Sequence, residues 1–257
     1  HAISLGLVGS ETWIRDRLPT SSVPTSPEKR SIARVFLSPE QQSVLEAAVK
    51  HGKNVFFTGS AGAGKSYLLR QMIHDLHAKY SKSSGAVAIT ASTGIAACNI
   101  GGITLHSFSG VGIGTGTVEQ LCRYVRRNRN AVTRWKKTSV LVIDEVSMID
   151  PKLFEKLECV ARHIRQSVKP FGGIQIIMSG DFFQLPPVSQ GATSFVFESP
   201  TCSQVIEQKC NLTQVFRQRD QQFVNMLNDM RLGKLAPEPI QALSKLERTP
   251  SLPEGIG

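Results

Sequence analysis

The amino-acid sequence predicts an α/β fold built on a doubly wound, mostly parallel sheet with helices on both faces. Short runs of apolar residues, each bounded by turn residues, alternate with helical segments along the chain. Successive positions within these runs are apolar, which is typical of strands that are covered on both faces. Parallel pairing is favoured because a helix between two strands supplies the long crossover that parallel strands need.

Each element has its own sequence signal. A helix start is indicated just after Leu37, with Ser38 as N-cap, Pro39 at the first helical position and Gln41 completing a capping box. Strands are predicted over 54–58, 86–90, 140–143 and 174–178. Further helices are predicted over about 64–80, from 93 onward and over about 151–168.

The two ends of the chain have the composition of connecting segments. Residues 1–36 lack periodicity and contain a Ser/Pro-rich stretch, so we expect a flexible linker or arm there. The chain begins with His1, and residues 248–257 are rich in Pro and Gly. We therefore expect one folded domain over 37–247 and a connector over 248–257 toward further sequence.

Charge and composition narrow the class of partner. Thirty Lys and Arg against twenty Asp and Glu give a net charge of +10, which favours a polyanion, with nucleic acid ahead of an anionic membrane surface. The five cysteines lack C-x-x-C spacing and support neither a zinc site nor a disulfide framework. No apolar run approaches the roughly 18 residues of a membrane span, so no membrane partner is expected.

Residues 120–143 carry much of this positive charge and no acidic residue. One interpretation is an electrostatic arm along DNA, which would supply sequence-independent affinity. The other is a solvated helix face, and the sequence leaves both open. The basic residues are Arg123, Arg126, Arg127, Arg129, Arg134, Lys136 and Lys137.

A phosphate-binding motif follows the first predicted strand and precedes a predicted helix. It matches G-x-x-x-x-G-K-[ST] and consists of Gly59, Ser60, Ala61, Gly62, Ala63, Gly64, Lys65 and Ser66. The glycines let backbone N–H groups curl around phosphate oxygens, Lys65 neutralises the β and γ phosphates, and Ser66 binds Mg²⁺. The motif predicts a P-loop NTPase site; the alternative is a Gly-rich turn that caps a helix.

Such a site needs an acidic element to hold the metal and orient water, expected on a neighbouring strand. Asp144 and Glu145 directly follow the apolar run 140–143. Asp144 is expected to contact Mg²⁺ through water, and Glu145 to act as general base on the attacking water. The alternative is an acidic pair that caps a strand end.

Five further stretches, taken with the phosphate site, resemble one family: superfamily-one DNA helicases of the PIF type (petite integration frequency), which are related to the RecD helicases. The resemblance covers about residues 37–235 and implies a RecA-like lobe. The stretches are Leu37–Gln41, Thr93–Ala97 with Thr104–Phe108, Gly180–Pro187, Leu212–Gln218, and Glu145–Asp150 through Pro170–Gly173.

The resemblance implies roles for three further residues of the nucleotide site. Gln41 would read the adenine edge, in addition to its capping role. Gln184 would sense the γ phosphate, the alternative being a turn amide. Arg217 would place its guanidinium on the transferred phosphoryl group, the alternative being an ordinary surface arginine.

The resemblance also implies a single-stranded DNA track. Thr93, Gly94 and Thr104 would contact phosphates, and His106 or Phe108 would lie against a sugar or base. For Phe108, a place in the hydrophobic core is an equally weighted alternative.

As a whole, the resemblance implies an ATP-driven 5′-to-3′ DNA helicase that uses Mg²⁺. Expected partners are ATP and single-stranded, forked or structured DNA. A monomer in the nucleus and mitochondrion is expected, with roles in telomere maintenance, replication, repair and recombination. Helicases of this superfamily close ATP between two RecA-like lobes, so we expect one lobe here, able to bind nucleotide but poor at hydrolysis. Rival interpretations are an ATPase that loads or remodels proteins, and a DNA-binding module with a vestigial nucleotide site.

Overall fold

The computed structural model describes residues 37–187, 194–216, 221–234, 240–241 and 244. The predicted N-terminal linker and the predicted connector over 248–257 lie outside the described residues, as does Arg217. Among the described helices, none combines the length and the apolar character that crossing a bilayer requires.

A sheet of six strands forms the centre of the described part, and every strand pair in it is parallel. The strand order is β3-β2-β4-β5-β1-β6. This confirms the predicted doubly wound α/β fold. The strands are β1 (Val55–Gly59), β2 (Val87–Ala91), β3 (Ile103–Thr104), β4 (Val140–Asp144), β5 (Gln175–Ser179) and β6 (Gln208–Leu212).

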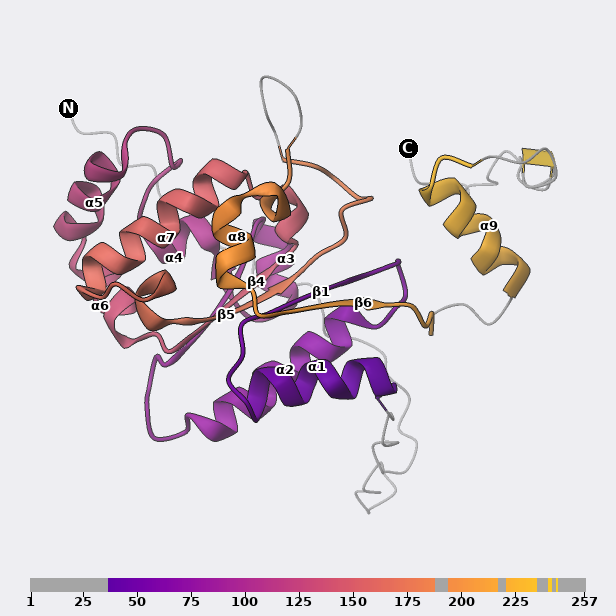
Figure 1. The fold of residues 1–257 in the computed structure, drawn as a ribbon, viewed down its shortest axis with the longest axis horizontal. Coiled ribbons are helices and arrows are strands. Elements are labelled where there is room, and N and C mark those ends of the chain that lie inside the picture. The colour runs from indigo at the N-terminus through magenta and orange to yellow at the C-terminus, as the bar shows by residue number, and fades with distance from the viewer. Residues whose placement is uncertain (1–36, 188–193, 217–220, 235–239, 242–243, 245–257) are drawn as a thin grey trace, which may run out of the picture. The chain divides into compact units, whose positions relative to one another are not determined.

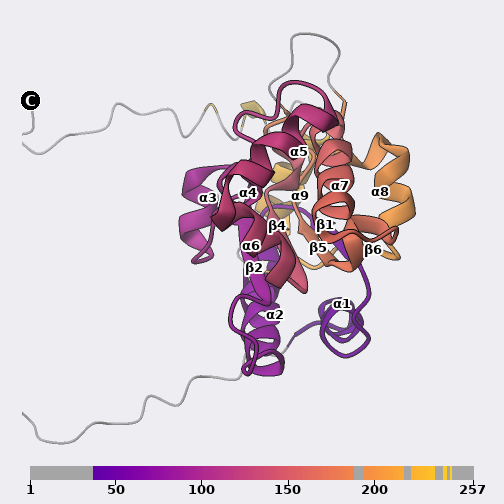
Figure 2. The same cartoon turned by 90° about the vertical axis from the view of Figure 1, so that its left-hand side faces the viewer.

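Helices cover both faces of the sheet. Figure 1 shows α1 and α2 below the strands and α7 and α8 above them. One hydrophobic core contains residues of α1 (Pro39–Val49), α2 (Lys65–Lys79) and α3 (Gly94–Asn99). The core on the other face contains residues of α4 (Leu105–Ser109), α5 (Val118–Arg127), α6 (Arg129–Lys137), α7 (Pro151–Arg165) and α8 (Pro200–Val205). In the side view of Figure 2, α4, α5 and α6 lie near one another.

The remaining elements are short helical turns and one further helix. Three 3₁₀ turns cover Val146–Met148, Pro170–Gly173 and Val196–Glu198. Helix α9 spans Gln221–Arg231 and returns to the sheet through Arg231, whose guanidinium bonds to the end of β1.

The apolar runs of the sequence are explained by this two-sided burial. In β4, Leu141 and Ile143 belong to the core under α7, whereas Val140 and Val142 belong to the core over α2. Neighbouring residues of a strand point to opposite faces, so a strand covered on both faces needs apolar residues at every position.

The strand order corrects one expectation. The strand carrying the acidic pair, β4, is not next to the phosphate-loop strand β1, because β5 lies between them and pairs with both. After α7, the chain adds β5 on the side of β4 that faces β1. The phosphate loop and the acidic pair nevertheless meet at one edge of the sheet, because parallel strands all end on the same side.

Candidate functional site

The phosphate loop leaves the carboxyl end of β1 and enters α2. Gly62 and Gly64 have left-handed backbones, with φ of 87° and 79°, and the loop is closed by a hydrogen bond from Ala63 N–H to the Ser60 carbonyl. A Cβ at residue 64 would lie 2.6 Å from the Gln41 amide nitrogen, so only glycine fits there. Beside the loop is a cavity of about 460 Å³, lined by Ala61, Gly62, Gly64, Lys65, Ser66, Tyr67, Glu145, Gln184 and Phe216.

Gln41 lies beneath this loop and is 3% exposed. Its Oε1 accepts a hydrogen bond from Ser38 N–H, and its Nε2 donates to the Ala63 carbonyl at 3.2 Å. The Ser38 hydroxyl in turn accepts from Gln41 N–H, which confirms the predicted capping box. The amide therefore joins the start of α1 to the phosphate loop, and its contact with adenine stays a prediction.

Lys65 is folded back on its own loop. Its amine donates hydrogen bonds to the carbonyls of Gly59 and Ser60, at 2.8 and 3.1 Å, and lies 3.8 Å from the Asp181 carboxylate. Burial, with a smaller contribution from the Arg231 charge, lowers the pKa of the amine. A phosphate group in the cavity would restore a full negative partner to this partly desolvated cation.

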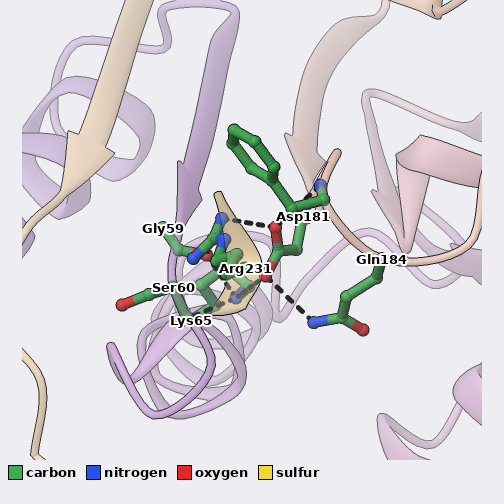
Figure 3. A network of polar contacts seen from close by, with 7 residues as sticks. Gly59, Ser60, Lys65, Asp181, Gln184 and Arg231 are labelled. Carbon is green, nitrogen blue, oxygen red and sulfur yellow. Dashed lines mark hydrogen bonds and ion pairs between the residues drawn. The ribbon is translucent and has the colours of Figure 1, made fainter. Parts of the chain in front are cut away.

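Asp181 is the hub of the polar network in Figure 3 and is 1% exposed. Its carboxylate accepts hydrogen bonds from Arg231, from the Gln184 amide at 3.0 Å and from Phe183 N–H at 3.1 Å. The Arg231 guanidinium also lies 4.8 Å from the centre of the Phe183 ring, and its Nη2 donates to the Gly59 carbonyl at 3.4 Å. Gln184 is therefore held in place by a buried, charge-paired residue.

Sequence reasoning missed both Asp181 and Arg231 as site residues. An acidic residue three positions after the apolar run 174–178 was a usable signal for Asp181, because the carboxyl ends of parallel strands meet at the edge where Asp144 also lies. No nearby sequence pattern pointed to Arg231, because its partners Asp181 and Gly59 lie about 50 and 170 positions away in the sequence.

Asp144 and Glu145 lie where the sequence predicted, at the carboxyl end of β4. Asp144 is 8% exposed, and burial raises its pKa. Burial and the neighbouring Asp144 raise the pKa of Glu145. Glu145 also has a left-handed backbone (φ 51°, ψ 46°), a conformation that costs a non-glycine residue about 1–3 kcal/mol and that often occurs at functional sites. The raised pKa makes Glu145 a stronger base than an ordinary glutamate, and its role as general base stays a prediction.

The cavity brings together most of the predicted catalytic residues. Lys65, Glu145 and Gln184 line it, together with Ser66, which was predicted as a metal ligand. Arg217 lies outside the described residues; the preceding residue, Phe216, is held to the loop by a hydrogen bond from its N–H to the Gly62 carbonyl at 2.9 Å. Phe216 and Tyr67, which sequence reasoning did not select, add two partly exposed aromatic rings to the lining.

The predicted DNA residues lie at the same edge of the sheet. Thr93 and Thr104 are the N-caps of α3 and α4, where their hydroxyls accept hydrogen bonds from Ala96 N–H and Ser107 N–H. The two threonines follow or end adjacent strands, since Ala91 pairs with Thr104 across β2 and β3. Gly94 is exposed with open space around it, and His106 is half-buried.

Phe108 requires a correction. Its ring is 1% exposed and packs edge-on against Trp135, with ring centroids 4.9 Å apart. Of the two alternatives for this residue, the structure selects the hydrophobic core, because the ring offers no face on which a base can stack. Apolar neighbours from α5 to α7 surround this position and remove it from the surface.

The model of the PIF1-like helicase family matches residues 36–239. The ATP-dependent DNA helicase PIF1 of Emericella nidulans is 52% identical over 223 residues, which are 86% of this chain and 30% of that protein. The crystal structure of Pif1 helicase from Candida albicans has a TM-score of 0.79 at 48% identity and covers 86% of this chain and 50% of that chain.

A second solved structure contains ligands. It is the Pif1 helicase from Bacteroides in complex with ADP-AlF3 and single-stranded DNA, with a TM-score of 0.68 at 30% identity, covering 86% of this chain and 52% of that chain. This chain thus spans less than a third of the Emericella relative and about half of the solved helicases. Its parallel sheet matches their RecA-like fold. Because the family model matches most of its residues, the chain belongs to the PIF1-like helicase family.

Proposed function

We propose that this chain is a motor lobe that binds Mg·ATP and single-stranded DNA within an ATP-dependent 5′-to-3′ DNA helicase. The observation that carries the proposal is the cavity in which Lys65, Ser66, Glu145 and Gln184 meet around a phosphate loop. Family membership supports the helicase class, and a relative at 30% identity binds both ADP-AlF3 and single-stranded DNA.

In the proposed reaction, the residues of the cavity divide the work of phosphoryl transfer to water. Lys65 exchanges the carbonyls of Gly59 and Ser60 for the β and γ phosphates. Glu145, whose pKa is raised by burial, accepts the proton of the attacking water. Gln184 contacts the γ phosphate, and Arg217 stabilises the charge on the transferred group.

The residues near the loop fit a magnesium ion. The Ser66 hydroxyl is exposed to the cavity and Asp144 offers a carboxylate, which are the hard oxygen donors that Mg²⁺ prefers together with water and phosphate oxygens. The buried Ser179 hydroxyl lies beside the Asp144 carboxylate, and its hydrogen-bonding interaction partly offsets the effect of burial on the pKa of Asp144. When bound, Mg²⁺ supplies charge neutralisation to the phosphates.

The proposed DNA track runs along Thr93, Gly94, Thr104 and His106. All four come from two adjacent helix starts at the carboxyl edge of the sheet, the edge that also holds the acidic pair. Forked or structured DNA, and work in the nucleus and mitochondrion as a monomer, are proposed on the family resemblance. A second RecA-like lobe, reached through the connector over 248–257, would complete the ATP site.

The first experiment is nucleotide binding and steady-state ATP hydrolysis by this chain, with and without single-stranded DNA. We expect fluorescent ATP to bind the wild type, Lys65→Ala to lose this binding, and turnover to be low in both. Equal ATP affinity of the wild type and Lys65→Ala would overturn the assignment of the cavity. High DNA-stimulated turnover would show instead that one lobe suffices.

A second measurement separates a helicase lobe from an ATPase that remodels proteins. Thr104→Ala combined with His106→Ala is expected to weaken binding of a fluorescent oligothymidylate while ATP affinity is retained. If the wild type binds neither single-stranded nor duplex DNA, the helicase proposal fails while the nucleotide site stands.

A further inference from the structure

A second cavity, of about 410 Å³, lies beside α5 and shares no lining residue with the nucleotide cavity. We call it the α5 pocket. Two arginines, a tyrosine and an amide side chain from one helix line it, together with two residues of the preceding loop. The lining residues are Thr115, Gly116, Gln120, Arg123, Tyr124 and Arg127.

The arrangement follows from the amphipathic pattern of α5. Leu121, Cys122 and Val125 are buried in the core that α5 shares with α6 and α7, so the intervening side chains must point away from the core. Arg123 and Arg127 are four residues apart and therefore lie one turn above the other on the same face. Within the described ranges neither guanidinium is in a salt bridge; Glu119, one turn before Arg123, is the carboxylate whose pKa the Arg123 charge helps to lower.

Tyr124 lies between the two arginines in sequence and is 59% exposed. A tyrosine ring is a large apolar surface, and rings of this kind are usually more buried than this one. In the same helix, Gln120 caps the start of α5 by accepting a hydrogen bond from Thr117 N–H, and its amide nitrogen remains a donor toward the pocket. The pocket thus combines two cations, one donor and one aromatic face.

The loop that leads into the pocket is continuous with the proposed DNA track. Helix α4, which begins after Thr104, is followed by its C-cap Gly110, and the chain then runs to α5 through a loop with glycine at every second position. These glycines all have left-handed backbones, with φ between 65° and 96°, so the loop follows a path that other residues would resist. This short loop joins the two places where we expect nucleic acid. The glycines are Gly110, Gly112, Gly114 and Gly116.

We propose that the α5 pocket binds one unpaired nucleotide of single-stranded DNA outside the track of the motor. The guanidinium groups of Arg123 and Arg127 contact the phosphates, and the ring of Tyr124 stacks on the base. An unpaired nucleotide fits better than a duplex, because a base inside a duplex has no free face for the ring. The inference rests on the proposed function in one respect, namely that this chain binds single-stranded DNA.

The other arginines of the basic segment are arranged differently and provide the comparison. Arg126 lies on the same helix but lines another cavity, with Cys159, Arg162 and His163. Arg134 donates hydrogen bonds to the carbonyls of Phe108 and Ser107 at 2.8 and 2.7 Å, so its role is structural. The positive charge of residues 120–143 is therefore not one uniform face.

The test is fluorescence anisotropy of an oligothymidylate long enough to reach both sites, with the full 257-residue chain. Arg123→Gln with Arg127→Gln is compared with Arg126→Gln with Arg129→Gln, which removes the same charge from outside the pocket. We expect the first pair to weaken binding by at least about 10-fold and the second by less than about 3-fold. Tyr124→Ala should lose about 5- to 100-fold, whereas Tyr124→Phe keeps the wild-type affinity.

An abasic oligonucleotide and a blunt duplex complete the experiment. The cost of Tyr124→Ala should vanish on the abasic strand, because the base that stacks on the ring is missing. The proposal is overturned if both arginine pairs weaken binding equally, if Tyr124→Ala has no effect, or if the duplex responds to Tyr124→Ala as the single strand does. If the double variant Thr104→Ala with His106→Ala loses DNA binding while the pocket variants bind as the wild type does, DNA binds along the proposed track and the pocket proposal is rejected. Absence of all DNA binding in the wild type would reject both.

Discussion

The carboxylate of Asp181 joins three parts of the nucleotide site that are far apart in sequence. It is paired with Arg231 of α9, it holds the amide of Gln184, and Lys65 of the phosphate loop lies 3.8 Å away. A buried carboxylate of this kind needs a neighbouring cation, because otherwise no attraction offsets the free-energy cost of removing its charge from water. Arg231 is therefore as much a part of the nucleotide site as the residues that the sequence motifs identify.

Arg231→Ala is expected to destabilise the nucleotide-free protein by about 2–3 kcal/mol. This is somewhat less than the roughly 3–5 kcal/mol for breaking a buried ion pair, because Lys65 remains near the carboxylate. Thermal unfolding should show a midpoint lower by about 5–10 °C. Arg126→Ala, an exposed arginine, is the control and should change the stability by less than about 0.5 kcal/mol.

A double substitution tests whether the effect passes through Asp181. Asp181→Asn removes the unpaired charge, so adding it to Arg231→Ala should restore part of the lost stability. If Asp181→Asn instead lowers the stability of Arg231→Ala further by its full single-variant cost, the two residues are not coupled.

Asp144 makes the stability depend on pH in a predictable direction. Burial raises its pKa above the ordinary value of about 4. Below that value both the folded and the unfolded chain carry the proton, and burial costs nothing. As the pH rises, the unfolded chain loses the proton first, so the free energy of unfolding falls between the ordinary and the raised pKa. This loss persists at neutral pH.

Asp144→Asn removes the charge that burial disfavours. Without nucleotide, its midpoint of thermal unfolding should match the wild type near pH 4 and exceed it near pH 7.5, while Mg²⁺-dependent nucleotide binding is lost. Scans of both proteins across this pH range provide the measurement. A difference in midpoint that is the same at both pH values would show that burial of the charge is not its cause.

At the scale of the elements, the sequence predicted those helices and strands that are stabilised by interactions between residues close together in the chain. The start of α1 was predictable because Ser38 and Gln41 satisfy each other's backbone N–H groups, and Pro39 at the first helical position has no N–H to satisfy. The four continuous apolar strands were predictable because both of their faces are buried. Strands β3 and β6 were not, since β3 has two residues and the edge strand β6 alternates exposed and less exposed positions.

Substitutions in the capping box can separate the structural role of Gln41 from its proposed contact with adenine. Ser38→Ala removes the cap hydroxyl alone and is expected to cost about 1 kcal/mol, with the preference for ATP over GTP unchanged. Gln41→Ala keeps the Ser38 cap but removes the acceptor of the Ser38 N–H, the bond to the Ala63 carbonyl and the proposed adenine contact. It should therefore lower the preference for ATP as well as the stability.

Denaturant unfolding and competition between ATP and GTP for the bound fluorescent nucleotide measure the two effects. An unchanged nucleotide preference in Gln41→Ala would restrict Gln41 to its structural role. A changed preference in Ser38→Ala would show that the cap itself shapes the adenine site.

At the scale of the whole molecule, the strand order decides which residues meet. The sequence indicated that Lys65, Asp144 and Gln184 belong to one site, but their distances depend on the insertion of β5 between β1 and β4. The position of Arg231 and the burial of Phe108 depend on long-range packing in the same way. Such contacts have no periodicity or spacing in the sequence, so only the folded structure identifies them.

The same order connects the nucleotide site to the proposed DNA track. Strand β2 pairs with β4, and Ser92 N–H, at the end of β2, donates a hydrogen bond to the Asp144 carbonyl at 3.1 Å. The next residue is Thr93, so one backbone hydrogen bond separates the proposed metal ligand from the proposed DNA contact. We therefore expect a change at Asp144 on nucleotide binding to reach the start of α3 through this bond.

We accordingly expect the two ligands to change each other's affinity by about 5- to 150-fold. Binding of fluorescent ADP with Mg²⁺ is measured with and without saturating oligothymidylate, and binding of the oligonucleotide with and without saturating Mg·ADP. Linkage requires the two factors to be equal, which checks the measurement itself. Thr93→Ala should reduce the factor by which one ligand changes the affinity for the other. In Lys65→Ala, the affinity for DNA should be the same with and without Mg·ADP. Affinities that are unchanged in both directions would show that the carboxyl edge of the sheet holds two independent sites, and that coupling between ATP and DNA needs parts of the helicase beyond this lobe.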